Sequence, residues 1–233
     1  MRSLTILFVG LLHGCSVNFA EDVESRVTAA RKSTDPWSTR NSILEAVDIG
    51  KRCEDYGLGP NRCALESKKQ KLKYEAEIAR YTDIAVQQAH PAAIKKLYHE
   101  GGNNDLFAKH GSLVIKKAED NTQHDGEVVR IAGLLISNGI GEKKDTRRAV
   151  ALFARSWALG VPEAAANAAT EFRSIHDHNN ALLWTLRCVS PCIRPGSLDD
   201  LQRHLTTKAI LQVQSAAHDD TVIELNIWAE NEK

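Results

Sequence analysis

The sequence lacks an excess of charge of either sign. Lys plus Arg and Asp plus Glu each total 30 among the 233 residues, so the formal net charge is zero. Domains dedicated to nucleic-acid binding usually carry a clear basic excess, and this balance argues against that class. Glycine and proline are also scarce, at 14 and 6 residues, and no segment is of low complexity. The composition is that of an ordinary folded protein.

Motifs that mark common active sites are missing as well. The chain contains neither H-E-x-x-H nor G-x-S-x-G, the signatures of zinc proteases and of many ester hydrolases. The glycines and lysines of segment 139–146 do not have the G-x-x-x-x-G-K-[ST] spacing of a phosphate loop, and no strand precedes them. His176 and His178 are two positions apart and cannot share a helical face, so we expect a solvated loop there. We therefore expect no active site, no cofactor and no metal.

The first residues have the pattern of an export signal. Arg2 precedes an apolar run over 4–12, which is too short to span a bilayer. The following Leu-His-Gly-Cys resembles the lipobox of bacterial lipoproteins, in which the cysteine, here Cys15, becomes the lipidated first residue. This resemblance implies a signal peptide over 1–14, an anchor or linker over 15–36, and a place at the periplasmic face of the outer membrane, because Ser16 is not the aspartate that retains such proteins at the inner membrane. Ordinary secretion after Ala20, giving a soluble periplasmic protein, and a cytoplasmic chain remain alternatives.

Four cysteines remain once Cys15 is set aside. An even number in an oxidising compartment predicts two disulfides, with three possible pairings. We favour the local pairing, Cys53–Cys63 and Cys188–Cys192, because both sequence separations are short. A four-cysteine zinc site is the alternative, but zinc-binding pairs are usually separated by two to four residues, and more residues than that lie between Cys53 and Cys63.

Helical patterns run through the rest of the chain, and long alternating strand patterns are absent. Asp125, Asp145, either Asn179 or Asn180, and Ser197 are the expected N-caps. The sequence therefore predicts an all-α fold with short connections. The expected helices are 63–88, 91–100, 105–118, 128–137, 146–159, 162–175, 181–189, 197–211 and 220–230.

The helices also recur with a period. Helix starts at Pro91, Gly126, Pro162 and Ser197 follow one another at intervals of 35 or 36 residues, with two helices in each interval. A helix pair every 34 to 47 residues is typical of an α-solenoid, in which stacked neighbours bury what one pair cannot. We expect a single right-handed α-solenoid domain of stacked antiparallel helix pairs over 37–233. Its best repeat is 126–161, and its weaker units are 91–125, 162–196 and 197–233.

The best unit resembles the Sel-one-like repeat, a relative of the tetratricopeptide repeat. The match is strong in this unit and degenerate in its neighbours, 76–124 and 162–189, while Ile136 replaces an aromatic residue of the pattern and Glu142 replaces a valine. The residues in register with the family pattern are Gly133, Leu135, Gly139, Gly141, Asp145, Ala149, Phe153, Ala158 and Gly160.

The resemblance implies a protein that binds another protein through its repeat surface and is not an enzyme. Sel-one-like lipoproteins occur as immunity proteins against toxic effectors, notably phospholipases, that type VI secretion delivers to the periplasm. They also occur as scaffolds in envelope or polysaccharide secretion assemblies, and an enzyme using a Cys–His pair is the third alternative. Candidate contact residues for the partner are Trp37, expected in a loop, and the basic helix residues Lys68, Lys69 and Lys71.

Overall fold

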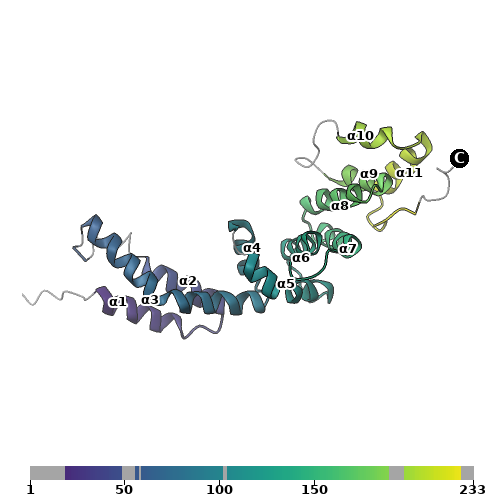
Figure 1. Cartoon of the computed structure of the whole chain (residues 1–233). Coiled ribbons are helices and arrows are strands. Elements are labelled where there is room, and N and C mark those ends of the chain that lie inside the picture. Colours follow the sequence, from purple (N-terminus) through teal and green to yellow (C-terminus); the bar gives the residue numbers. More distant parts are fainter. Residues whose placement is uncertain (1–18, 49–55, 58, 102–103, 189–196, 227–233) are drawn as a thin grey trace, which may run out of the picture. The chain divides into compact units, whose positions relative to one another are not determined.

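The chain folds into helices that form two compact units. The computed structural model describes residues 19–48, 56–57, 59–101, 104–188 and 197–226. Every regular element within these residues is an α-helix, which confirms the all-α prediction for them (Figure 1). The N-terminal unit comprises Met1–Thr82 and the C-terminal unit comprises Asp83–Lys233. The boundary lies within α3, Pro60–Gln87. The region 37–233, which we expected to be a single domain, is therefore divided between the two units.

The N-terminal unit contains α1 (Phe19–Ala30), α2 (Pro36–Val47) and most of α3. Val23 and Val27 of α1 are fully buried in one hydrophobic cluster with Ile43 of α2 and Tyr74 of α3. The expectation of a linker over 15–36 therefore does not hold for residues 19–30. The valines recur at i and i+4, which gives α1 an apolar stripe to bury.

The start of α2 corrects the expectation for Trp37. The Asp35 carboxylate accepts hydrogen bonds from the backbone N–H groups of Trp37 and Ser38 at 3.2 and 3.0 Å, and Pro36 occupies the first turn. An acidic N-cap followed by proline is a strong helix start. Trp37 therefore lies in a helix rather than a loop and is only 5% exposed, with the Arg40 guanidinium 4.5 Å from its ring centroid. It is a core residue, which counts against Trp37 as a contact residue for a partner.

The C-terminal unit places consecutive helices against one another. After the end of α3 come eight helices in the described residues, and α5 to α9 pack in chain order, each against the next from α5·α6 to α8·α9. In addition α4 packs against α6, α6 touches α8, and α10 and α11 both pack against α9. The bounds are α4 Pro91–Glu100, α5 Asn104–Glu119, α6 Gly126–Asn138, α7 Thr146–Ala158, α8 Glu163–Ser174, α9 His178–Arg187, α10 Ser197–Arg203 and α11 Thr207–Ala217.

The repeat-motif glycines each meet a geometric demand. Gly139 ends α6 in the left-handed conformation with φ of 70°, as expected for a helix-terminating glycine. Gly141 has φ of 79°, and a Cβ there would lie 2.8 Å from the backbone nitrogen of Ser112 in α5. Gly133 lets α6 approach α7, because a Cβ would lie 2.6 Å from the ring of Phe153. Gly160 has φ of 88° directly after the end of α7.

The other motif residues divide between caps and core. The Asp145 side chain accepts the N–H of Arg148 and caps α7, and Asp125 caps α6, so both predicted caps are confirmed. Leu135, Ala149 and Phe153 are fully buried. Ala158 is exposed at the end of α7, where nothing in the structure demands a small side chain.

The last third of the chain differs from the sequence prediction in three ways. The N-cap of α9 is Asp177, whose carboxylate accepts the N–H of Asn180 at 3.0 Å, rather than Asn179 or Asn180. The helix predicted over 197–211 is two helices, because Thr206 caps a new one by accepting the N–H of Ala209 at 3.2 Å. Residues 220–226 of the helix expected over 220–230 are not helical, and the remainder of that prediction lies outside the described residues.

Candidate protein-binding surface

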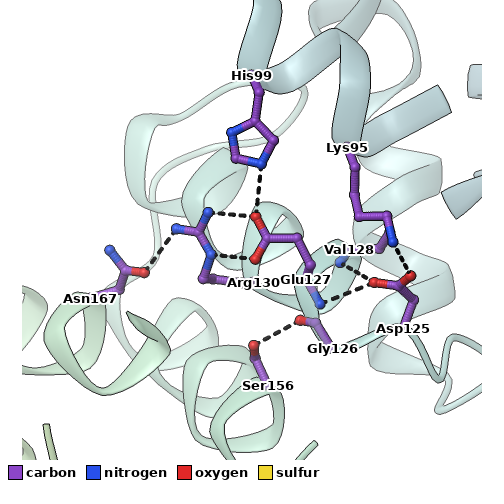
Figure 2. A network of polar contacts seen from close by, with 9 residues as sticks. All are labelled: Lys95, His99, Asp125, Gly126, Glu127, Val128, Arg130, Ser156 and Asn167. Carbon is purple, nitrogen blue, oxygen red and sulfur yellow. Dashed lines mark hydrogen bonds and ion pairs between the residues drawn. The ribbon is translucent and has the colours of Figure 1, made fainter. Parts of the chain in front are cut away.

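A network of polar contacts joins the three helices α4, α6 and α8 (Figure 2). Arg130 of α6 donates two hydrogen bonds to Glu127, from Nε at 2.7 Å and from Nη2 at 2.6 Å. His99 Nε2 of α4 lies 3.0 Å from Glu127 Oε1, and Arg130 Nη1 donates to Asn167 Oδ1 of α8 at 3.3 Å. One bidentate ion pair on α6 therefore connects both flanking helices.

A second contact between α4 and α6 uses the cap of α6. Asp125 accepts the N–H groups of Glu127 and Val128 at 3.1 and 3.2 Å with one carboxylate oxygen. Its other oxygen accepts a hydrogen bond from Lys95 Nζ of α4 at 2.6 Å. The carboxylate thus neutralises the positive end of the α6 dipole and orients a lysine of the neighbouring helix at the same time.

The side chains of this network differ in burial: some are largely buried and others are exposed to solvent. The Arg130 side chain is 14% exposed, whereas His99 is 57% exposed. Burial alone raises the pKa of Glu127, but the hydrogen bonds and charges of Arg130 and His99 bring that pKa below its ordinary value. The Glu127 pairing raises the pKa of Arg130 in turn. Arg130 and Glu127 therefore form a fixed ion pair, and Lys95 and His99 are held in defined positions facing solvent.

Two buried polar contacts fix the helices beneath this face. The Ser156 hydroxyl of α7 is fully buried and donates to the Gly126 carbonyl at the start of α6 at 2.7 Å (Figure 2). Glu171 of α8 is buried and accepts hydrogen bonds from the hydroxyls of Ser137 in α6 and Thr146 in α7, the latter at 3.1 Å. Buried polar groups with few alternative partners hold helices in one register, so these contacts fix α6, α7 and α8 relative to one another.

The basic residues predicted to contact a partner lie elsewhere. Lys68, Lys69 and Lys71 are exposed along α3 in the N-terminal unit. Leu65 and Leu72 are exposed on the same helix, at 64% and 63%. The structure brings these lysines together on one helix but provides them with no part in the α4–α6–α8 network.

The histidine pair has a neighbour that sequence reasoning missed. His178 stacks on His204 of the segment after α10, with ring centroids 4.4 Å apart and planes 13° apart. His176 lies 6.4 Å from the His178 ring. Burial, followed by the nearby His204 and His176, lowers the pKa of His178. Within the described residues, no group of three or more His, Cys, Asp or Glu side chains is arranged to hold a metal ion.

Only some of the residues in the disulfide and lipidation predictions lie within the described part of the chain. Cys63 and Cys188 are each disulfide-bonded, while their predicted partners Cys53 and Cys192, and the lipidation candidate Cys15, lie outside the described residues. Among the helices that the structure describes, none is both long and apolar enough to cross a bilayer.

Sequence reasoning did not find Lys95, His99, Glu127 and Arg130. The i, i+3 spacing of Glu127 and Arg130 was an available signal for a pair on one helix. The contacts to α4 and α8 carry no such signal, because they depend on which helices are neighbours. No family model, curated protein or solved structure matches the chain.

Proposed function

We propose that this chain is a non-enzymatic protein-binding module and that the face of α4, α6 and α8 contacts the partner. One observation carries the proposal: the Arg130–Glu127 pair joins α4, α6 and α8 and positions the exposed His99, while Asp125 positions Lys95 beside it. Side chains held before binding lose little conformational entropy on association. Positioned charges at an interface favour a partner of complementary charge.

The finer fold proposal belongs with this function. We propose that the C-terminal unit is a right-handed α-solenoid of antiparallel helix pairs. The packing of α6 on α7 and α8 on α9, with contacts between α4, α6 and α8, supports this arrangement. In a solenoid the first helices of successive pairs line one continuous surface that can bind an extended area of another protein.

The partner that we propose is a secreted toxic effector, such as a type VI phospholipase, which this protein would neutralise as an immunity protein. The support is the repeat unit over 126–161, which resembles Sel-one-like lipoproteins and whose glycines and caps have structural roles. Masking the catalytic cleft of the effector would follow from shape and charge complementarity. The alternative is a scaffold in an envelope or polysaccharide secretion assembly.

A protection assay tests both the function and the surface. Cells that lack this gene should be poisoned only when the effector encoded beside it is present. Lys95→Glu combined with His99→Glu should abolish protection, because the charge at Lys95 is reversed and the exposed His99 imidazole is replaced by a carboxylate. Lys143→Glu, on an exposed lysine of the α6–α7 connection, is the matched control and should protect fully.

The outcomes separate the candidate functions. Damage to the envelope in the absence of any effector would favour the scaffold. Hydrolysis of lipid by the purified chain would favour an enzyme. Equal protection by the Lys95/His99 variant and the Lys143 variant would place the binding surface elsewhere. Lipid anchoring through Cys15 at the periplasmic face of the outer membrane is a separate proposal, and Cys15→Ala should then release the protein from the membrane fraction.

A further inference from the structure

An extended segment of the chain's own C-terminal region lies against α9. The Asn180 carboxamide binds both backbone groups of Leu225: Nδ2 donates to the Leu225 carbonyl at 3.1 Å, and Oδ1 accepts the Leu225 N–H at 2.7 Å. One turn further along α9, Trp184 Nε1 donates to the Ile223 carbonyl at 3.0 Å. All three hydrogen bonds reach main-chain atoms, so any extended peptide could make them.

The groups that hold this segment are positioned independently of it. Asn180 is fully buried, and its Nδ2 also donates to the Asp177 carboxylate at 2.8 Å, which fixes the orientation of the carboxamide. Trp184 is buried as well, with its ring 5.6 Å from Trp157 in an edge-to-face contact. Without a peptide backbone, Asn180 Oδ1 and the Trp184 N–H would lose the hydrogen-bond partners that they have in the structure, which is unfavourable wherever water does not replace them. The site is therefore built for a peptide.

The geometry also specifies the form of the peptide. Asn180 binds one residue through its N–H and C=O, and Trp184 binds the carbonyl two residues earlier. Residues two apart face the same side only in an extended chain. Ile223 is 49% exposed, whereas Val222 and Leu225 are half-buried. The site therefore favours an extended peptide that is bound mainly through its main chain, with a half-buried aliphatic side chain at the position of Leu225.

The chain is held by Arg187 up to Asp219 and by Asn180 and Trp184 beyond it. Arg187 Nη2 donates to the carbonyls of Ala216 and Asp219 at 3.2 and 2.5 Å, and its guanidinium carbon lies 5.2 and 4.9 Å from the ring centroids of Trp157 and Trp184. This contact fixes the chain where it leaves α11. Beyond the turn that Asp219 forms with Thr221, the described residues are held to α9 by the three backbone hydrogen bonds, so residues 222–226 can leave without disturbing the Arg187 contact.

We propose that Asn180 and Trp184 form a binding site for an extended aliphatic peptide segment of a partner protein, and that residues 222–226 occupy this site in cis until the partner's segment replaces them. The site lies on α9 and does not depend on the surface proposed on α4, α6 and α8. The resident segment competes at an effective concentration on the order of millimolar, as a short tether gives. Such competition restricts binding to segments that match the site.

Peptide binding to full-length variants tests this proposal. Leu225→Pro removes the N–H that Asn180 accepts and should free the segment. The probe is a fluorescent, end-blocked peptide with the sequence of residues 219–226. By fluorescence anisotropy, it should bind the Leu225→Pro variant about tenfold or more tightly than the unaltered chain, because losing one good hydrogen bond of the resident segment removes most of its competition. Glu224→Pro is the matched control, because the Glu224 N–H donates no hydrogen bond to any residue that the structure describes, and it should behave as the unaltered chain does.

Two further variants check the site itself. The Leu225→Pro chain should lose peptide binding when Asn180→Asp is added, since the aspartate cannot donate to a carbonyl. A probe that carries the leucine-to-proline change should bind about tenfold or more weakly than the unmodified probe. In the unaltered chain, millimolar unmodified peptide should shift the backbone N–H signals of residues 222–226 in an NMR spectrum, which reports replacement directly.

Three results would overturn the proposal. A folded Leu225→Pro chain that does not bind the probe would show that the site accepts no peptide in trans. Loss of helical circular dichroism in that variant would make residues 222–226 an integral part of the fold. Concentration-dependent dimerisation of the unaltered chain that Leu225→Pro abolishes would assign the site to the same segment of a second copy.

Discussion

Replacing Gly133 by alanine should destabilise the C-terminal unit, although the same change inside a helix usually stabilises. Alanine is favoured over glycine in a helix interior by about 1 kcal/mol. Here the added Cβ would lie 2.6 and 2.8 Å from two ring carbons of Phe153. That ring is fully buried, so it cannot swing away from the new methyl group. Overpacking of this kind costs ~1–3 kcal/mol, which exceeds the helix-propensity gain over most of this range, so we expect a net loss of up to about 2 kcal/mol.

Urea unfolding followed by tryptophan fluorescence measures this change. A Trp37→Phe background removes the tryptophan of the N-terminal unit, so that the remaining signal reports the C-terminal unit. Phe153→Leu in the Gly133→Ala chain should recover part of the lost stability, although Phe153→Leu alone leaves a cavity and destabilises. A double-mutant cycle should therefore give a coupling of about 1 kcal/mol or more. A Gly133→Ala chain that is more stable by the full helix-propensity gain would refute this account of the α6–α7 contact.

Three other predictions follow from single contacts. Gly141→Ala should lower the thermal midpoint more than Gly160→Ala. Both glycines have positive φ, where an alanine costs ~1–2 kcal/mol, but only at Gly141 would the added Cβ also meet backbone atoms, at 2.8 Å. Equal losses in the two variants would contradict this. Hydrogen bonds, chiefly from Lys73 and Tyr74, lower the pKa of Glu24 from 4.5 to about 2. The resulting stabilisation is complete above pH 4.5 and lost as the pH falls towards 2, so Glu24→Gln should flatten the pH dependence of the urea midpoint in that window. Glu127→Gln should cost ~1–3 kcal/mol in urea unfolding, because it leaves the mostly buried Arg130 without its counter-charge, whereas an unchanged midpoint would show that the pair is dispensable.

Features that depend on neighbours in the sequence were predictable. Asp125 and Asp145 cap helices, and Gly139 ends one, because each acts on backbone groups within a few residues of itself. Two further helix caps are equally local, but one was assigned to the wrong residue and the other was not predicted. Asp177, not the asparagines after it, caps α9, and Thr206 starts a separate helix α11.

The candidate sites could not be predicted in this way. Nothing near Asn180 in the sequence indicates that its carboxamide binds Leu225, because the two residues are brought together only when α11 packs on α9. The ion pair of Glu127 and Arg130 is local, but its contact with His99 requires α4 to lie beside α6. Such contacts are decided by packing between elements distant in the chain.

The sequence by itself therefore determined that the described chain is helical and where most helices begin and end, since capping and periodicity are short-range properties. It also supplied the glycines that permit close approach, without stating what they approach. Only the tertiary structure decided which side chains are covered: it buried Trp37, left Leu65 and Leu72 exposed, and paired Gly133 with Phe153. Burial depends on the neighbour that each helix face meets, and that neighbour is set by the packing of the whole unit.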